Sequence, residues 1–322
     1  MEDTSNLFPR VTAGSVAPGR CCRGCTGNML GLRLHNYEVV AQLGEGSTGT
    51  VWLALNACNG QQAAVKFLRP ELLHEEGAIV RFVNESRATN AIRHPNVVDI
   101  IHAGVLRCDG RTPYLMMEFL EGESLCQRLQ RSRPLPVHEA IDIACQIASA
   151  LAAAHGLQIV HRDLKPENLY LVPDNTMAEQ VRVKVLDFGI AKLCGSMNDS
   201  SARTRTGVLL GTPQYMSPEQ CLGVSGTIDH RTDIYALGTI LYEMLCGQVP
   251  FVSEGIGEIL ICQVFEDPPS LRSRLPEIPE SLERVVLRAL AKKPEERFAS
   301  MLDFAQAVHE AVPEVVRKAA VA

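Results

Sequence analysis

The densest group of chemically versatile side chains lies between residues 161 and 168. These residues read H-R-D-L-K-P-E-N and have apolar neighbours on both sides. Phosphoryl transfer needs alignment, neutralisation of charge and an acceptor for the hydroxyl proton. Asp163 can accept that proton, Lys165 can neutralise the γ-phosphate, and Asn168 can bind Mg²⁺ through its amide oxygen. The segment therefore predicts a catalytic loop for phosphate transfer.

A further carboxylate follows the strand predicted at residues 181–186. Asp187 begins a D-F-G triplet directly after that strand. Magnesium prefers oxygen ligands and keeps several waters, so one or two protein groups per ion suffice. Asp187 and Asn168 are therefore the candidate ligands for Mg²⁺, for which Mn²⁺ can substitute. A lone D-F-G turn after a strand is common, so the triplet counts only together with the catalytic loop.

A glycine-rich stretch at residues 43–51 matches the pattern G-x-G-x-x-G-x-V. Dinucleotide-binding folds use a similar string to open a helix. Here residues 51–55 continue as a strand, which predicts a β-hairpin instead. Glycines let backbone amides lie close over phosphates without a clash from Cβ. The candidate nucleotide-binding residues of this stretch are Leu43, Gly44, Glu45, Gly46, Ser47, Thr48, Gly49 and Val51.

Lys66 ends the run A-A-V-K on the next predicted strand. An isolated lysine on a strand is usually only solvated, but after a phosphate loop a cation can hold the α- and β-phosphates. Such a lysine needs a carboxylate to fix it. Glu85 lies midway along a predicted helix between residues 75 and 93, three residues after the core-facing Phe82. Glu85 is therefore preferred to the other acids nearby.

Two kinds of element must position these residues. Short β-branched or alternating runs predict strands at residues 37–43, 50–56, 62–68, 98–105 and 113–119. Apolar residues at helical spacing predict helices at residues 137–155, 232–246, 279–292 and 300–312. Strands followed by helices indicate an α+β fold rather than alternating βαβ units.

The bulk composition of the 322 residues excludes several classes of protein. The length suggests two domains or one two-lobed unit. A net charge of −6 lacks the basic footprint of a nucleic-acid-binding protein. We see no signal peptide and no run near the roughly 18 apolar residues of a membrane span. We therefore expect a cytoplasmic protein with no nucleic-acid partner and no membrane span.

The eleven cysteines are odd in number and scattered, unlike the disulfide framework of a short secreted chain. Cys21, Cys22 and Cys25 form the one cluster, and they could be half of a zinc ribbon. A structural zinc site needs four ligands, and no second C-x-x-C follows. Ordinary reduced thiols are the preferred interpretation.

The glycine loop, strand lysine, helix glutamate, H-R-D-x-x-x-x-N loop and D-F-G triplet resemble, in this order, the eukaryotic-like (Hanks-type) protein kinases. The resemblance covers about residues 37–312. It implies a two-lobed kinase fold, with a small antiparallel sheet and one regulatory helix at residues 37–120 and a larger, mainly helical lobe at 121–312. Residues 1–36 would be a flexible leader and residues 313–322 a tail. ATP would bind between the lobes.

The resemblance also assigns roles to further residues. Ala64 would line the ATP site, Met117 would be the gatekeeper, and Glu118 and Leu120 would lie in the hinge that meets the adenine. Residues 211–219 look like the loop that receives a protein substrate, followed by a variant of the A-P-E motif in which Ser217 replaces alanine. The supporting residues implied are Glu219, which would pair with Arg297, and Asp233, which would lie beneath the catalytic loop.

The family's pattern also indicates which hydroxyls are phosphorylated. Lys165, two residues after Asp163, is typical of serine/threonine kinases, and Thr212 agrees with it. We therefore expect transfer from ATP to Ser and Thr acceptors of protein substrates. The composition and the S-P-E-Q segment suggest a bacterial member.

Regulation can be inferred from Arg162, because the family links an arginine before the catalytic aspartate to phosphorylation of the activation segment. Thr204 and Thr206 resemble autophosphorylated threonines of bacterial members. A phosphate adds about two negative charges and can dock on clustered cations such as Arg162 and Lys192. We expect autophosphorylation to order this segment, with a homodimer to carry it out in trans.

Two alternative functions fit the sequence less well. A pseudokinase acting as a scaffold usually lacks a catalytic group, but Lys66, Asp163, Asn168 and Asp187 are all present. A kinase for small molecules is disfavoured because residues 211–219 are typical of a peptide-binding loop.

Overall fold

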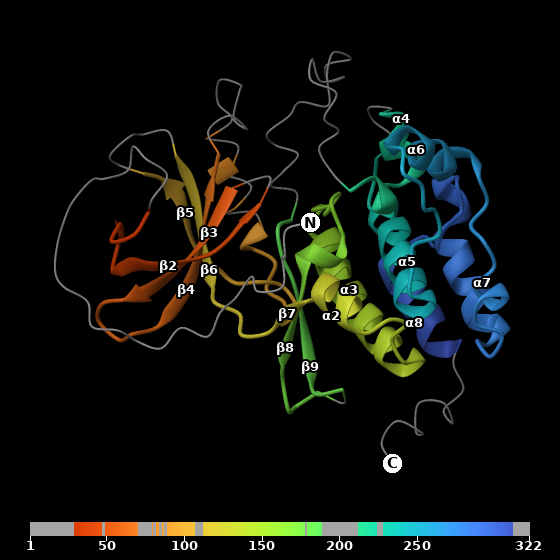
Figure 1. The fold of residues 1–322 in the computed structure, drawn as a ribbon, viewed down its shortest axis with the longest axis horizontal. Helices are drawn as coiled ribbons and strands as arrows, with labels where there is room; N and C mark the ends of the chain where they lie inside the picture. The colour runs from red at the N-terminus through yellow and green to blue at the C-terminus, as the bar shows by residue number, and fades with distance from the viewer. Residues whose placement is uncertain are drawn as a thin grey trace. The chain divides into compact units, whose positions relative to one another are not determined.

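The computed structural model describes residues 29–46, 49–69, 79, 82–83, 86, 89–106, 112–177, 179–188, 212–223 and 228–311. The chain divides into two compact units (Figure 1). Among the described residues, the first unit holds 29–91 and 98–120. The second holds 92–97 and everything from Glu121 onward.

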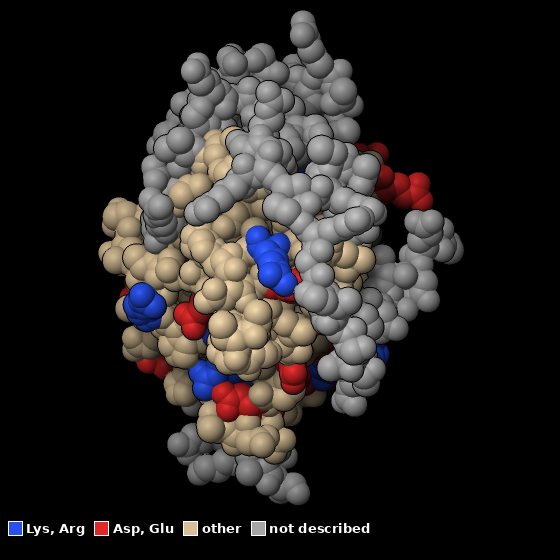
Figure 2. All heavy atoms as spheres, turned by 90° about the vertical axis from the view of Figure 1, so that its left-hand side faces the viewer, with Lys and Arg blue, Asp and Glu red and all other residues tan. Residues whose placement is uncertain are grey.

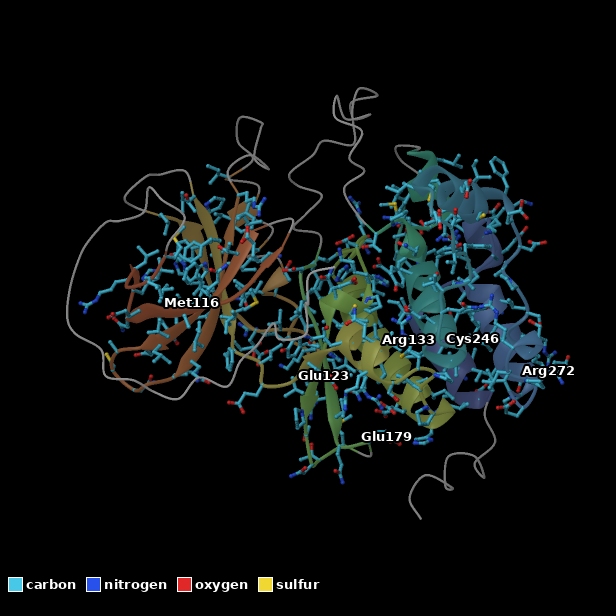
Figure 3. The ribbon with its side chains drawn as sticks, in the orientation of Figure 1. Met116, Glu123, Arg133, Glu179, Cys246 and Arg272 are labelled. Carbon is cyan, nitrogen blue, oxygen red and sulfur yellow. The ribbon has the colours of Figure 1, made fainter. Side chains whose placement is uncertain are left out.

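The first unit is built on a six-stranded antiparallel sheet. Its strands are β1 (Arg33–Leu34), β2 (Tyr37–Gly46), β3 (Gly49–Asn56), β4 (Gln62–Leu68), β5 (Ile100–Val105) and β6 (Pro113–Glu118). They lie in the order β1-β2-β3-β4-β6-β5, and every neighbouring pair is antiparallel. A buried apolar cluster lies on the sheet and includes Trp52, Val65, Phe67, Tyr114 and Met116. Met116 is labelled among the side chains of this sheet in Figure 3.

The start of this sheet differs from the sequence prediction. Residues 33–34 were assigned to a flexible leader, yet they form β1, which pairs with β2, and Leu34 is buried in the core. A strand of two residues is too short to show the alternation by which strands are recognised. β2 also continues three residues beyond the predicted end at residue 43, because the glycine stretch itself joins the ladder.

The second unit is mainly helical. Its helices are α2 (Leu125–Arg131), α3 (Val137–Gly156), α4 (Pro218–Leu222), α5 (Arg231–Cys246), α6 (Ile256–Phe265), α7 (Glu280–Ala289) and α8 (Met301–Glu310). A small antiparallel sheet contains β7 (Glu123–Ser124), β8 (Leu169–Pro173) and β9 (Val181–Val185), in that order. Short 3-10 turns lie at η2 (Pro166–Asn168), η4 (Pro213–Tyr215), η5 (Leu271–Ser273) and η6 (Pro294–Glu296).

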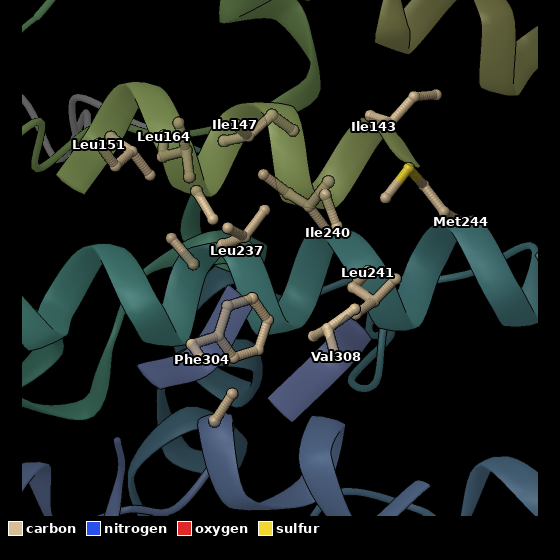
Figure 4. Packing of buried hydrophobic residues seen from close by; sticks show 14 of the residues in the cluster. Ile143, Ile147, Leu151, Leu164, Leu237, Ile240, Leu241, Met244, Phe304 and Val308 are labelled. Atoms are coloured by element: carbon tan, nitrogen blue, oxygen red, sulfur yellow. The ribbon is translucent and has the colours of Figure 1, made fainter. Parts of the chain in front are cut away.

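Helix α5 forms the centre of this unit. All of its residues from Thr232 to Leu245 are buried, which is expected of a helix surrounded by other elements. Leu237, Ile240 and Met244 face α3, and Phe304 and Val308 of α8 pack on another side (Figure 4). This packed core gives the neighbouring loops a rigid support.

Helix α3 is long and apolar enough to cross a membrane by length and composition alone. More than half of its apolar window, 56%, is buried inside the unit. Its apolar residues are therefore explained by core packing. On the described surface seen in Figure 2, basic and acidic side chains are interspersed.

Several predicted elements are confirmed by the structure. α3 and α5 match their predicted bounds within a residue, while α7 and α8 end two or three residues early. α2, α4 and α6 were not predicted. The segment at residues 92–97 belongs to the second unit because Asn96 Nδ2 donates to Gln146 Oε1 and Val183 O, each at 2.8 Å.

Candidate active site

The catalytic loop, residues 161–168, connects α3 to β8 and brings three predicted residues together. Asn168 Nδ2 donates to Asp163 O at 2.9 Å and lies 3.4 Å from Asp163 Oδ2. Lys165 Nζ is also 3.4 Å from that carboxylate oxygen. The side chains of Asp163 and Lys165 are 23% and 21% exposed, so the carboxylate is fixed by neighbours but still accessible.

Asp233, from the first turn of α5, anchors the loop from inside the unit. Its buried carboxylate accepts hydrogen bonds of 2.8 Å from His161 N, Arg162 N and His155 Nε2. Burial acts to raise the pKa of Asp233, but the hydrogen bond from His155 leads the effects that outweigh it, so the pKa is lowered. A charged Asp233 therefore holds the main chain of the loop.

Two residues at this site have a left-handed backbone, Arg162 with φ +62° and Asp187 with φ +54°. Such residues cost about 1–3 kcal/mol each and persist where the surroundings fix them. Arg162 is fixed on both sides, because its N–H donates to Asp233 and its carbonyl accepts from Gln220 Nε2 at 2.7 Å. The strain is therefore held by α4 and α5.

The chain that carries Asp187 is tied to the catalytic loop by two hydrogen bonds. Leu186 N donates to Asn168 O at 2.9 Å, and His161 Nε2 donates to Leu186 O at 2.9 Å. The buried Phe188 ring packs against the His161 ring, with 4.9 Å between the ring centres. These contacts bring Asp187 and Asn168 into neighbouring positions.

The donor set of Asn168 and Asp187 fits a magnesium-like ion. Because the Asn168 amide nitrogen donates to Asp163, the amide oxygen is the atom that can act as a ligand. An amide oxygen and a carboxylate suit a hard cation that keeps several waters. Among the described residues, no group of three or more His, Cys, Asp or Glu could hold a metal ion. A metal here would rest on few protein ligands.

Residues 212–219, here called the 212–219 segment, are held by a buried ion pair at their end. Glu219 accepts two hydrogen bonds of 2.8 Å from Arg297, whose side chain is fully buried. Burial acts to raise the pKa of Glu219, but the hydrogen bonds from Arg297 outweigh it and the pKa is lowered. Arg297 also lies over the Tyr235 ring at 5.0 Å. Arg297 thus links the segment, through Glu219, to Tyr235 of α5.

Ser217, which stands where the resemblance expects alanine, has a buried hydroxyl. That hydroxyl lies 2.5 Å from Thr232 Oγ1 at the start of α5. Because the added polar group has a partner, the serine avoids the penalty of an unsatisfied buried hydroxyl.

In the first unit, the glycine-rich stretch forms the predicted β-hairpin, with Gly46 opposite Gly49. A Cβ on Gly49 would lie 2.0 Å from Phe67 O, so the sheet itself requires glycine there. Around Gly46, no described atom lies within 4 Å of where a Cβ would be. Glu45 forms an exposed ion pair of 2.6 Å with Arg69.

The other nucleotide-binding candidates lie on neighbouring strands of this sheet. Lys66 on β4 is 9% exposed and pairs with Val51 and Leu115. Ala64 pairs with Met117, and the N–H of Glu118 donates to Asp99 O. Leu43 is buried, Gly44 pairs with Val51, and Leu120 is the last of the described residues in this unit. The candidates Ser47, Thr48, Glu85, Thr204 and Thr206, together with Lys192 and the Cys21–Cys25 cluster, lie outside the described residues.

Sequence reasoning did not single out His155, Gln220 or Gln263. His155 and Gln220 hold the catalytic loop through Asp233 and Arg162, and Gln263 contacts the 212–219 segment. Each lies in a helix where only its buried polar side chain distinguishes it. A polar residue at an otherwise core-facing position was the one signal available.

Comparison with known proteins agrees with this geometry. The sequence-family model of the protein kinase domain matches residues 37–311 of this chain. The serine/threonine-protein kinase Pkn1 of Myxococcus xanthus is 41% identical over 312 residues, covering 96% of this chain and 43% of that protein. PknB of Mycobacterium leprae is 37% identical, covering 81% of this chain and 40% of that protein.

A crystal structure of the Mycobacterium tuberculosis PknI kinase domain is also similar. It superposes with a TM-score of 0.68 at 27% identity and covers 88% of this chain and 98% of that domain. The chain spans less than half the length of the two curated relatives. The chain therefore belongs to the protein kinase family, and its domain is of the bacterial serine/threonine type.

Proposed function

We propose that the whole protein transfers the γ-phosphate of ATP to Ser and Thr hydroxyls of protein substrates, with Asp163 as the proton acceptor. The observation that carries this proposal is the arrangement of Lys165 and Asn168 around one partly exposed carboxylate. Asp163 would orient the hydroxyl and take its proton, while Lys165 would neutralise the γ-phosphate.

Asn168 and Asp187 would hold a divalent ion, Mg²⁺ with Mn²⁺ as a substitute. Protein kinases in general use ATP with a divalent metal ion. The ion, when bound, would offset negative charge on the phosphate oxygens. The hydrogen bonds between Leu186 and the catalytic loop would keep the two ligands in register.

The first unit would bind ATP. The glycine hairpin and Lys66 would contact the phosphates, with Glu85 fixing the lysine. Ala64 and Met117 would line the adenine site, and Glu118 and Leu120 would meet the base through their main chain. The catalytic domain would span residues 37–312. The cytoplasm, where ATP is abundant, is the proposed location, and no disulfide bond joins the described cysteines.

The principal test compares wild type with Asp163→Asn, using ATP, Mg²⁺ and a histone preparation. Loss of the proton acceptor should lower kcat by about 10²- to 10⁴-fold. Asp174→Asn, which changes an aspartate in the β8–β9 turn, is the matched control and should keep its activity. Equal rates for wild type and Asp163→Asn would favour the pseudokinase alternative and defeat the proposal.

Autophosphorylation of Thr204 or Thr206 in a homodimer is the proposed means of activation. Arg162, which is exposed next to Asp163, supports it as a cation that could receive the phosphate. Mass mapping of the purified protein with and without ATP should find phosphate on one of these threonines. Unmodified threonines in a fully active protein would contradict the proposal.

A further inference from the structure

Gln263 of α6 is 1% exposed, and each polar atom of its side chain has a partner. Nε2 donates to Pro213 O at 3.1 Å and to Gln214 O at 2.6 Å. Oε1 accepts a hydrogen bond from the Tyr235 hydroxyl. These bonds fix the orientation of the amide, because neither end can exchange roles. Gln263 therefore connects α5 to the main chain of η4.

Core packing alone does not explain a buried amide at this position. A methionine would fill a similar volume without the cost of removing an amide from water. The turn that Gln263 contacts has long internal hydrogen bonds, with Tyr215 N 3.3 Å from Thr212 O and Met216 N 3.2 Å from Pro213 O. The bond from Gln263 to Gln214 O is shorter than either, so α6 is one of the elements that hold this turn, together with Glu243 of α5, which accepts a hydrogen bond of 2.6 Å from the Tyr215 hydroxyl.

Lys292 contacts the main chain of the same residue. Its Nζ donates to Cys262 O at 3.1 Å and Gln263 O at 2.9 Å, at the C-terminal end of α6. It also lies 4.5 Å from the centre of the Phe251 ring. A cation at the end of a helix is favourable for the exposed carbonyls. Burial lowers the pKa of Lys292 to about 8, so this charge is kept there at a cost.

We propose that Gln263 is a positioning residue for the protein substrate, which sets the main chain of Pro213–Tyr215 against which the acceptor peptide lies. Lys292 holds Gln263 in place from the far side. This inference rests on the proposed function and on the resemblance, which implies that residues 211–219 receive the protein substrate. It assigns α6 a role in substrate binding that is separate from ATP binding and from the chemistry of Asp163.

The test uses the full chain and measures kcat and KM for a histone preparation and for ATP. Gln263→Met removes three buried hydrogen bonds while keeping the volume. It should raise the histone KM by about tenfold, the effect of roughly one lost hydrogen bond, and leave the ATP KM unchanged. Tyr235→Phe keeps the ring over Arg297 and removes only the hydroxyl, so a rise of about threefold is expected. Gln306→Met, on the exposed face of α8, is the control.

The two KM values separate positioning from general damage. An unchanged histone KM in a folded Gln263→Met variant would overturn the inference, and so would equal changes in the ATP and histone KM. If Gln263→Met does not fold, Tyr235→Phe decides by the same two measurements. Thr212→Ala tests the segment directly. If it raises the histone KM while both other variants do not, only the role of Gln263 fails; if none does, peptide docking on this segment fails.

Discussion

The catalytic loop and the 212–219 segment are both held by a buried carboxylate, but the partners differ. Asp233 accepts two main-chain N–H groups of the loop itself, so the carboxylate sets the backbone directly. Glu219 pairs with the side chain of Arg297, which follows η6 between α7 and α8. The first arrangement controls local geometry, and the second joins elements that are far apart in the chain.

This difference predicts different consequences when either carboxylate is changed. We call Asp233 and the Glu219–Arg297 pair the two anchors. When one partner of a buried ion pair is lost, the other charge stays buried without compensation. The main consequence is a loss of stability. A carboxylate that orients backbone N–H groups has a direct effect on the residues that follow, here Asp163. We therefore expect changes at Glu219–Arg297 to affect folding and changes at Asp233 to affect catalysis.

The largest effect is expected for Arg297→Met. It leaves the Glu219 carboxylate buried and unpaired, which should lower the free energy of unfolding by about 3–5 kcal/mol. Urea unfolding measures this, with Arg284→Met on the exposed face of α7 as the control. The double variant Glu219→Leu/Arg297→Met should recover much of the loss, because an apolar pair replaces the ions. A double variant no more stable than Arg297→Met would contradict this reading of the pair.

A smaller effect on stability, but a larger one on rate, is expected for Asp233→Asn. An amide of the same shape cannot accept all three hydrogen bonds, and an unsatisfied buried donor costs about 1–3 kcal/mol. If the hydrogen bond that is lost is one to the catalytic loop, kcat should drop by about tenfold or more with an unchanged ATP KM. Steady-state kinetics on the folded variant measures this. An unchanged kcat would remove the contrast between the anchors.

The grouping of the candidate catalytic residues could be predicted because they lie close together in the sequence. Asp163, Lys165 and Asn168 fall within six residues, so one short loop is enough to bring them together. The strand of Lys66 and the glycine hairpin could be predicted for a different reason, because a strand pattern marks each segment. The sheet and the helices α3 and α5 have clear periodicity, so their existence was also predictable.

The residues that hold the catalytic loop and the 212–219 segment were harder to predict. Gln263 and His155 act on partners about 50 and 78 positions away, so their roles arise only when the helices pack. Asp233 and Arg297 were found by family resemblance, because no local pattern links them to their partners. Helix α6 was missed because its exposed side is apolar, as Ile261 and Phe265 show, while its buried side carries the polar Gln263, so no apolar stripe marks one face.

Acid conditions should act on both anchors in the same direction. The pKa values of Asp233 and Glu219 lie below their ordinary values of 3.8 and 4.5. A carboxyl with a lowered pKa contributes stability that is full above the ordinary value and is lost as pH falls through the folded one. Unfolding free energies should therefore decline below about pH 4.5. The Glu219→Leu/Arg297→Met variant should show a shallower decline, and an identical slope would mean that Glu219 contributes none of it.

The smallest effect is expected where the two anchors meet. Ser217 of the segment contacts Thr232, which is the neighbour of Asp233, so this hydroxyl pair lies between them. Ser217→Ala leaves Thr232 Oγ1 without that partner and should cost about 1 kcal/mol of unfolding free energy. Ser217→Ala/Thr232→Val removes both polar groups and should cost less than the single change. If Ser217→Ala instead lowers kcat as strongly as Asp233→Asn, the two anchors act as one unit, and the separation of stability from catalysis does not hold.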